Sequence, residues 1–290
     1  MIKLIDKFSR KDLPFNNKMK KSWDDNGYLI ISDFYKDIEC DKLRSQAQKL
    51  IKNYNHDDYV SFFDTKNQNH ANDKYFLESG DKIRFFFENK AFDKKGNLNN
   101  SIDLVINKIG HALHDLDPVF EKFSKRRDLD QIAKFIGINN PKLLQSMYIF
   151  KQPRIGGEVH CHQDSTFLYT IPESVVGFWV ALEDANLKNG CLWVAKGAHK
   201  GPLRKIFLKD KNKTIMKTLN NKNFEKTNTP LEVKKGSLVL LHGRLPHCSG
   251  ENSSINSRHA YTLHVINGDC EYPKNNWLQR PHMPLNGFLD

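Results

Sequence analysis

The sequence lacks an apolar run of about eighteen residues, the length that a membrane span requires. Residues 1–13 alternate charged and apolar side chains and contain no apolar signal core. It also lacks a Ser/Gly/Pro-rich linker, an internal repeat and a low-complexity tract. These absences argue against a membrane-spanning, secreted or multi-domain array protein. We therefore expect a cytoplasmic protein whose residues 1–290 form a single domain.

Cysteine is scarce and scattered. The sequence contains five cysteines and no Cys-x-x-Cys: Cys40, Cys161, Cys191, Cys248 and Cys270. This usage fits a reducing compartment better than a disulfide framework. Cys161 lies between two histidines and raises a structural zinc site as an alternative, although no zinc-finger spacing occurs elsewhere.

Lysines spread along the chain produce the net charge of +11. A basic balance suits nucleic acids or acidic small molecules. However, the sequence contains no basic groove interleaved with aromatics and no helix-turn-helix pattern. We expect a small-molecule substrate rather than nucleic acid, and we predict no oligomeric state. With 39% hydrophobic and 27% charged residues, the composition is that of a soluble globular protein.

The first half of the sequence alternates helical and extended patterns. Apolar periodicity predicts helices at 14–26, 37–54, 102–116 and 128–136. Short runs of β-formers predict strands at 28–31 and 82–87. The polar stretch 55–80 is typical of a loop. We expect the helices of about 1–140 to pack on one face of a β-barrel.

From about residue 141 the pattern changes to short apolar runs separated by turn residues. The predicted strands are 143–151, 175–182, 191–195, 237–241 and 259–266. Close spacing of short strands indicates a sandwich or barrel. We therefore predict a mainly β fold with flanking helices and a barrel core at about 141–270. Residues 200–230 are rich in Lys, Asn and Thr and fit an insertion between strands.

A His-x-Asp motif offers metal ligands. His162 and Asp164 are two residues apart, so on an extended segment they point to the same side. His247 follows the apolar run 237–241 and offers a second imidazole. Two histidines and one carboxylate leave coordination positions open, as in non-haem Fe(II) oxygenases. We interpret His162, Asp164 and His247 as metal ligands and catalytic residues of an iron and 2-oxoglutarate dependent oxygenase.

Arg258 lies eleven residues after His247, at the start of a predicted strand. 2-Oxoglutarate chelates iron through its 2-oxo acid end, which leaves a distal carboxylate. A guanidinium can donate two parallel hydrogen bonds to such a carboxylate. This spacing strengthens the interpretation of the His-x-Asp motif, which alone occurs by chance in many proteins.

Longer motifs then place the sequence in a family. They include SGDKIRFFFE (79–88), INKIGHALH (106–114), QSMYIFKQP (145–153), HQD followed by FLYT (162–170), EDA (183–185), NGCLW (189–193) and NWLQ (276–279). Through these motifs the chain resembles the phytanoyl-CoA dioxygenase family over most of its length. The resemblance implies a double-stranded β-helix, which is a jelly-roll, cupin-like barrel with flanking helices.

The resemblance also implies roles for individual residues. Its iron ligands match His162, Asp164 and His247. Its 2-oxoglutarate contacts match Lys82, Met147, Trp179, Ser249 and Arg258, of which Arg258 is the principal carboxylate anchor. The implied cofactors are Fe(II), 2-oxoglutarate as co-substrate and O2, with ascorbate as a candidate reductant. The implied reaction is hydroxylation of a C–H bond, with release of succinate and CO2; the family name suggests an acyl-CoA-like substrate.

Two other functions remain open from the sequence. One is a non-catalytic barrel that binds metal and 2-oxoglutarate as a sensor; the intact triad and Arg258 argue against it. The other is a nucleic-acid demethylase with the same iron chemistry, for which the sequence shows no base-accepting groove. His160, two residues before His162, is a candidate for competing with the ligands or orienting them.

Overall fold

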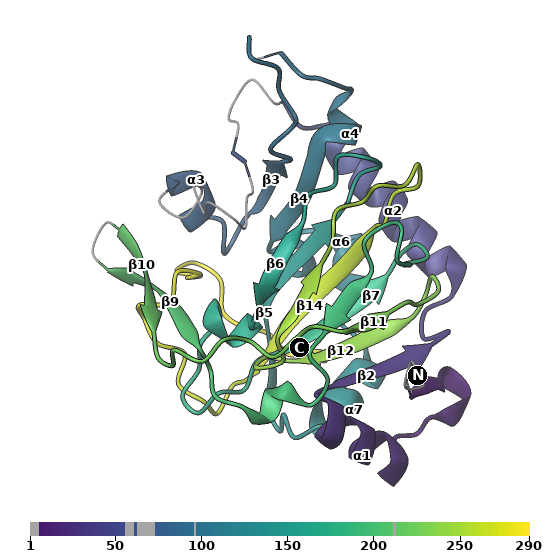
Figure 1. Ribbon diagram of the computed structural model, residues 1–290, viewed down its shortest axis with the longest axis vertical. Helices are drawn as coiled ribbons and strands as arrows, with labels where there is room; N and C mark the ends of the chain where they lie inside the picture. Colours follow the sequence, from purple (N-terminus) through teal and green to yellow (C-terminus); the bar gives the residue numbers. More distant parts are fainter. Residues whose placement is uncertain (1–5, 56–60, 63–72, 96, 211–212) are drawn as a thin grey trace.

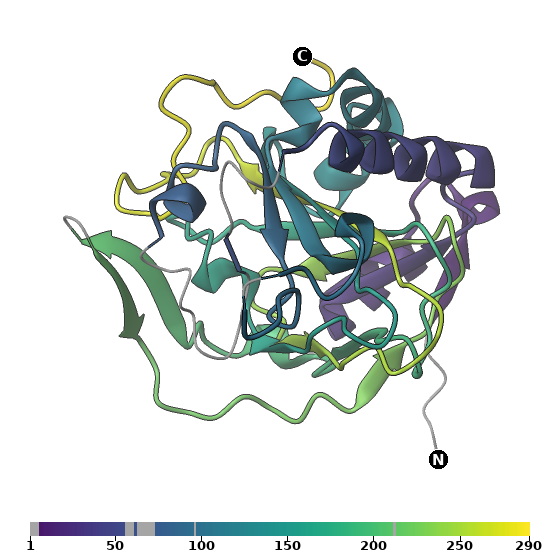
Figure 2. The same ribbon diagram turned by 90° about the horizontal axis from the view of Figure 1, so that it is seen from above.

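The computed structural model describes residues 6–55, 61–62, 73–95, 97–210 and 213–290. Three layers follow one another in Figures 1 and 2: a group of helices, a large β-sheet and a smaller β-sheet. The described chain is mainly β with flanking helices, as expected. The two facing sheets form a barrel-like, cupin-type core, and the cavity described below lies between them.

The large sheet has the spatial order β1-β2-β12-β7-β14-β5-β4-β3. All neighbouring pairs are antiparallel except β1 and β2. The strands are Lys7–Ser9 (β1), Tyr28–Ser32 (β2), Ile83–Phe87 (β3), Ile106–His111 (β4), Pro141–Ile149 (β5), Val176–Ala181 (β7), Leu238–His242 (β12) and Ala260–Asn267 (β14). Strands from both halves of the sequence therefore share one sheet.

Helices cover one face of this sheet, namely Asn17–Asn26 (α1), Asp37–Lys52 (α2), Ile102–Val105 (α4), Leu113–Leu116 (α5), Pro118–Ser124 (α6) and Arg127–Phe135 (α7). The short helix Lys74–Leu77 (α3) lies apart from them, and its Phe76 lines the cavity. On β12, Leu238 and Leu240 pack in the helix-side core, whereas Val239 and Leu241 pack in a second core on the opposite face. Both faces of the sheet are buried, which explains why this strand is a continuous apolar run.

The small sheet has the order β11-β8-β13-β6. Its strands are Val159–His162 (β6), Leu192–Val194 (β8), Thr229–Leu231 (β11) and His247–Ser249 (β13). A separate hairpin of Lys205–Asp210 (β9) and Lys213–Thr218 (β10) projects beside the two sheets in both views (Figures 1 and 2). The predicted insertion at 200–230 is thus this hairpin followed by the start of a small-sheet strand.

The structure corrects the prediction of one helix over 102–116. Only α4 and α5 are helical there, and Ile106–His111 is strand β4, paired with β3 and β5. Both faces of this strand are buried, so polar and apolar residues do not alternate along it as they do in a half-buried strand. The spacing of its apolar residues therefore suits a helix equally well. The predicted strands 28–31 and 82–87 are confirmed as β2 and β3, and together with β4 they join the large sheet, so the β core extends beyond the predicted 141–270.

Most other predicted elements are confirmed within a few residues. Helix α1 ends at Gly27, whose φ of 74° is the left-handed conformation that glycine adopts readily. The predicted loop 55–80 contains α3, and its residues 56–60 and 63–72 lie outside the described part of the chain.

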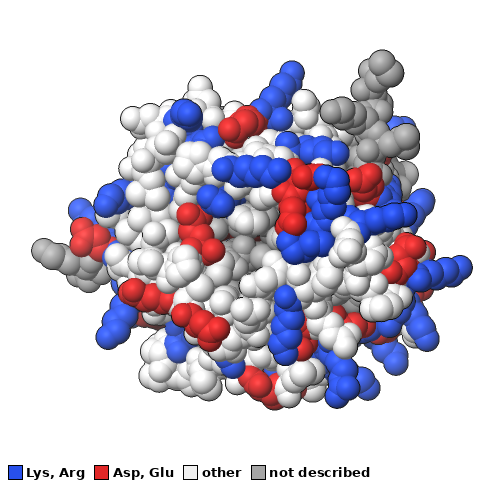
Figure 3. Space-filling model, turned by 90° about the horizontal axis from the view of Figure 1, so that it is seen from below, with Lys and Arg blue, Asp and Glu red and all other residues white. Residues whose placement is uncertain are grey.

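The helices and the surface charge bear on the expectations of no membrane span and no nucleic-acid partner. In the described residues, no helix is both long and apolar enough to cross a membrane. On the face shown in Figure 3, basic side chains are interspersed with acidic and uncharged ones. This view shows no continuous basic stripe of the kind that a nucleic-acid backbone requires.

Candidate metal centre

Two neighbouring strands bring the predicted ligands together. His162 is the last residue of β6, and His247 is the first residue of β13. These strands are antiparallel, and their register places His247 directly opposite His162. Directly opposite residues point to the same face, so the two imidazole centroids lie 4.3 Å apart. Asp164 begins a short 3-10 helix immediately after β6 and is buried.

The ligand atoms converge on one point. Oδ1 of Asp164 lies 3.5 Å from Nε2 of His162 and 3.6 Å from Nε2 of His247. The three candidate ligand atoms all lie within 4.8 Å of one another. Within the described part of the chain, no other group of three His, Cys, Asp or Glu side chains meets this criterion.

Backbone hydrogen bonds determine which imidazole nitrogen faces the site. Nδ1 of His162 lies 2.8 Å from the carbonyl oxygen of His160, and Nδ1 of His247 lies 2.9 Å from that of Leu245. A carbonyl oxygen only accepts, so each Nδ1 must carry the hydrogen and donate. In the neutral rings, both Nε2 lone pairs are therefore directed at the same point, as metal ligation requires.

The electrostatics favour the ligating forms of two of the three groups. Burial opposes ionisation of Asp164, but His247 and His264 outweigh it and hold the pKa of Asp164 well below its usual value. Burial lowers the pKa of His247 to about 4. For His162, burial is outweighed by Asp164, which raises its pKa. Because a cation would replace the proton on His162, these residues fit a divalent metal with open positions.

A third histidine adjoins the carboxylate. His264, on β14, is buried and places Nε2 3.4 Å from Oδ2 of Asp164, the oxygen that does not face the two ligand histidines. No motif in the sequence marks His264. Its only signal is its place on the strand that follows Arg258, with no spacing to the other ligands.

The triad lines a cavity of about 250 Å³ between the sheets. Four of the five residues predicted to contact 2-oxoglutarate line the same cavity, namely Met147, Trp179, Ser249 and Arg258. The structure therefore brings these residues to the predicted metal ligands. Their binding roles remain predictions.

Arg258 lines this cavity and is only 2% exposed. Its Nε donates to the carbonyl oxygen of Gly190 at 3.1 Å, and Nη2 donates to Oγ of Ser249 at 3.4 Å. Within the described residues, Nη1 has no hydrogen-bond partner. Burial lowers the pKa of Arg258 to about 10, so the guanidinium stays charged at neutral pH. A buried, charged donor without a partner is costly and fits an anionic ligand.

Lys82 does not reach this site. It is exposed in the turn before β3 and does not line the cavity. The lysine that does lie beside Met147 is Lys108 on β4, whose Nζ is 3.8 Å from the Met147 sulfur. Burial lowers the pKa of Lys108 well below its usual value. Of these two lysines, Lys108 is therefore the one whose side chain lines the cavity.

The remaining residues of the motif have separate positions. His160 lines the cavity, but its Nδ1 faces Glu158 at 3.4 Å, and its carbonyl oxygen orients His162. Cys161 also lines the cavity and is not one of the three candidate ligands. Gln163 is fully buried outside the cavity lining, where its Nε2 donates to the carbonyl oxygen of Arg244 at 2.7 Å.

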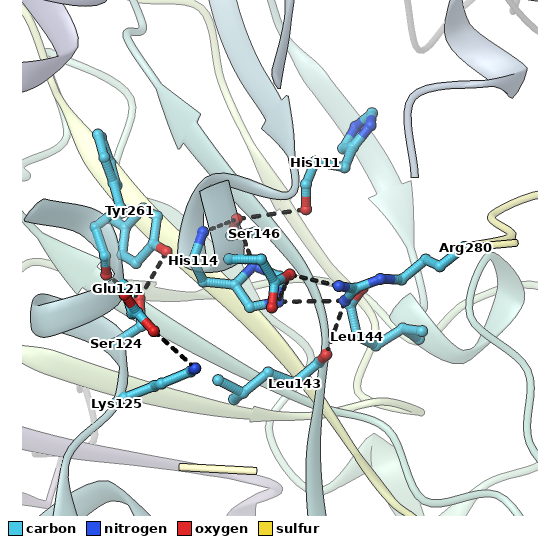
Figure 4. Close-up of polar contacts among 12 residues, drawn as sticks. His111, His114, Glu121, Ser124, Lys125, Leu143, Leu144, Ser146, Tyr261 and Arg280 are labelled. Carbon is cyan, nitrogen blue, oxygen red and sulfur yellow. Dashed lines mark hydrogen bonds and ion pairs between the residues drawn. The ribbon is translucent and has the colours of Figure 1, made fainter. Parts of the chain in front are cut away.

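A buried polar network lies behind the cavity wall (Figure 4). On β5, Gln145 and Met147 line the cavity, whereas the intervening Ser146 faces the opposite side. Oγ of Ser146 lies 2.8 Å from Nδ1 of His114, and Nη1 of Arg280 lies 3.3 Å from Nε2 of the same ring. This network ties the C-terminal segment to the strand that carries Met147.

Comparison with known proteins gives the chain a family. The sequence model of phytanoyl-CoA dioxygenase (PhyH) matches residues 23–260. "Phytanoyl-CoA dioxygenase" of Arabidopsis thaliana is 46% identical over 259 residues, covering 89% of this chain and 91% of that protein. "Phytanoyl-CoA dioxygenase domain-containing protein 1" of Danio rerio is 41% identical, covering 88% and 91%.

A solved structure agrees in fold. The crystal structure of EctD from S. alaskensis with bound Fe superposes with a TM-score of 0.62 and 17% identity, covering 94% of this chain and 84% of that one. At this identity the likeness shows the fold alone, and it confirms the predicted cupin-like architecture. With the family match over most of its length, the chain belongs to the phytanoyl-CoA dioxygenase family.

Proposed function

We propose that this protein is an Fe(II)- and 2-oxoglutarate-dependent dioxygenase that hydroxylates a C–H bond of a small molecule and releases succinate and CO2. One observation carries the proposal. The convergent Nε2 atoms of His162 and His247, the ionised Asp164 and the partnerless Nη1 of Arg258 line a single cavity. Three ligands with open positions suit iron, and a buried guanidinium suits the distal carboxylate of 2-oxoglutarate.

Each residue has a defined task in this proposal. His162, Asp164 and His247 hold the metal on one side and leave positions for other ligands. Arg258 and Ser249 bind the distal carboxylate, and Trp179, whose ring centroid is 5.4 Å from the guanidinium carbon, forms a wall there. When bound, iron and 2-oxoglutarate supply the activation of O2. The chain contributes orientation and a mainly apolar cavity between the two sheets.

A second group of cavity-lining residues is mainly aromatic and suits an apolar part of a substrate. It includes Phe76, His111, Phe167, Phe207 and Trp277. The Phe76 and Trp277 rings are stacked with centroids 4.3 Å apart, and the His162 and Phe167 ring centroids are 6.0 Å apart. Asp164 is the only carboxylate among the described cavity residues. We therefore place the reacting carbon of the substrate on an apolar group that contacts these rings.

Substrate-independent turnover tests the proposal. Purified protein loaded with Fe(II) is incubated with 2-oxoglutarate, ascorbate and air, and succinate is measured. We expect succinate release that His162→Ala, Asp164→Ala and His247→Ala each abolish, because each loses a ligand. His282→Ala, which changes an exposed histidine, is the matched control. Iron-dependent succinate release by all three triad variants would disprove the assignment.

The same samples distinguish the alternatives. A sensor would bind 2-oxoglutarate without producing succinate. A nucleic-acid demethylase would bind DNA or RNA with an affinity that falls steeply as salt rises. Absence of such binding, together with succinate release, supports a small-molecule hydroxylase. To locate the substrate site, Trp277→Ala should change the stimulation of turnover by candidate apolar substrates and leave the affinity for 2-oxoglutarate unchanged.

A further inference from the structure

A buried lysine adjoins Arg258 in the cavity. Lys151 is the second residue after the end of strand β5, is 2% exposed and lines the cavity. Its φ of 41° is in the left-handed region, which is uncommon for a residue other than glycine. Its Nζ donates to the carbonyl oxygen of Gly157 at 2.6 Å. The ammonium group has three hydrogens, so this bond leaves two donors for another ligand.

Lys151 and Arg258 share a common support at Gly190. The carbonyl oxygen of Gly190 accepts from Nε of Arg258 and, at 3.0 Å, from Oγ of Ser249. A Cβ at Gly190 would lie 2.9 Å from Cε of Lys151, so the lysine stem passes directly over this residue. The backbone N–H of Arg258 also donates to the carbonyl oxygen of Lys151 at 3.3 Å. The two cationic side chains are therefore held side by side.

Neither cation has a carboxylate partner at close range. Among the described residues, no carboxylate lies within 4.0 Å of the charged nitrogens of Lys151 or Arg258. Glu88, the buried acid of this region, uses Oε2 to accept the N–H of Gly157 at 3.2 Å. Glu158 and Glu251 also act on Lys151, but only through longer-range attraction. Two buried cations without an anion are costly, so an anionic ligand between them would be strongly favoured.

The titration of Lys151 agrees with this geometry. Burial and then the charge of Arg258 lower the pKa of Lys151 to about 7, while Glu88, Glu158 and Glu251 act in the opposite direction. A bound carboxylate would favour the charged form and restore the proton.

We propose that Lys151 binds the distal carboxylate of 2-oxoglutarate together with Arg258 and Ser249, and thereby restricts the co-substrate to a dicarboxylate. The inference rests on the function proposed above and gives Lys151 a specificity-determining role. Lys151 would turn a single charged anchor into a two-cation site. A 2-oxo acid without the distal carboxylate would gain no binding affinity from Lys151.

The test compares two ligands that differ only at the distal end. Manganese-loaded protein is titrated calorimetrically, without O2, with 2-oxoglutarate and with 2-oxopentanoate, which has the same chain length and no distal carboxylate. We expect Lys151→Met to weaken 2-oxoglutarate binding by about tenfold or more, the usual effect of losing one charge-assisted hydrogen bond. Binding of 2-oxopentanoate should not change. Lys82→Met removes an exposed lysine and should alter neither ligand.

Other outcomes separate the possible failures. If Lys151→Met weakens both ligands equally, or lowers manganese affinity, then Lys151 only holds the loop at Gly157 and the proposal is overturned. If Lys151→Met binds 2-oxoglutarate like the wild type while Arg258→Met does not, Lys151 has no role but the proposed function stands. If the wild-type protein binds neither ligand, the proposed function itself fails. Lys151→Arg keeps the charge and should retain most of the preference for 2-oxoglutarate.

Discussion

Nε2 of His264 lies 3.4 Å from Oδ2 of Asp164, while Oδ1 of the same carboxylate faces His162 and His247. The two oxygens of Asp164 therefore have different partners. An N–H on His264 would hold Oδ2 and leave Oδ1 free for a metal. Groups that orient a ligand in this way raise metal affinity.

We predict that His264→Phe weakens metal binding, because phenylalanine keeps the ring volume and removes the donor to Asp164. The expected loss is about 10- to 100-fold in affinity, as is common when a group that orients a ligand is removed. Calorimetric titration with Mn(II) measures it, with the exposed His282→Phe as the control. An unchanged affinity would show that Asp164 is oriented without His264.

Replacement of Arg258 should act mainly on the co-substrate. Arg258→Met removes the buried guanidinium whose Nη1 has no partner. We expect the apparent KM for 2-oxoglutarate to rise about 10- to 100-fold with a smaller change in kcat. The KM of Arg258→Lys should lie between those of the wild type and Arg258→Met, because an ammonium group keeps the positive charge but lacks the planar fork of the guanidinium. Succinate release over a range of 2-oxoglutarate concentrations checks this; an unchanged KM would mean that another cation anchors the distal carboxylate.

The ion pair between Arg280 and Asp115 should contribute strongly to stability. Both side chains are almost fully buried, and Nη1 of Arg280 also donates to the carbonyl oxygens of Leu143 and Leu144, each at 3.1 Å. Breaking a buried pair leaves one charge without its partner, so Arg280→Met should lower the free energy of unfolding by about 3–5 kcal/mol. Urea unfolding measures this loss.

A double variant provides the control for this pair. The double variant Asp115→Asn, Arg280→Met should lose much less unfolding free energy than the sum of the losses of the two single variants, because it leaves no unpaired buried charge. Additive losses would show that the two side chains do not interact.

His114 should make the protein less stable in acid. Burial, and next the charge of Arg280, lower its pKa from 6.5 to about 3. Between these values the unfolded chain binds a proton that the folded protein excludes, so stability falls as the pH drops below 6.5. At pH 5 this group alone should account for about 2 kcal/mol of lost stability.

A variant isolates this contribution. In His114→Gln, the difference in unfolding free energy between pH 7 and pH 5 should shrink by about 2 kcal/mol. Urea unfolding at both pH values measures it, and the exposed His282→Gln should leave the difference unchanged. If both variants retain the wild-type difference, the imidazole of His114 is not excluded from protonation in the folded protein.

The sequence predicted local features better than distant relationships. Helices α1, α2 and α7 and strands β2, β7, β12 and β14 follow from local apolar patterns and turn residues. The run 102–116 misled the prediction, because strand β4 is buried on both faces and shows helix-like spacing. Its identity as a strand depends on pairing with β3 and β5, which no local pattern reveals.

The lysines show the same limit. The family resemblance predicts that Lys82 contacts 2-oxoglutarate, but Lys82 is exposed and is not among the residues that line the cavity. Lys108 and Lys151 do line the cavity, the first from the interior of β4 and the second from two residues after the end of β5. The sequence shows only that each of the three positions is a lysine. Which of these side chains faces the cavity depends on strand register and backbone conformation, and these are set by the folded structure.

The sequence by itself determined the fold class, the family and the three candidate metal ligands, His162, Asp164 and His247, because donor type and local spacing are properties of the chain. Only the tertiary structure decided which other groups surround them. It placed His264 against the free oxygen of Asp164, and Lys151 beside Arg258. Both relationships join residues far apart in the sequence, and they arise from the register and burial of strands that pair only in the folded protein.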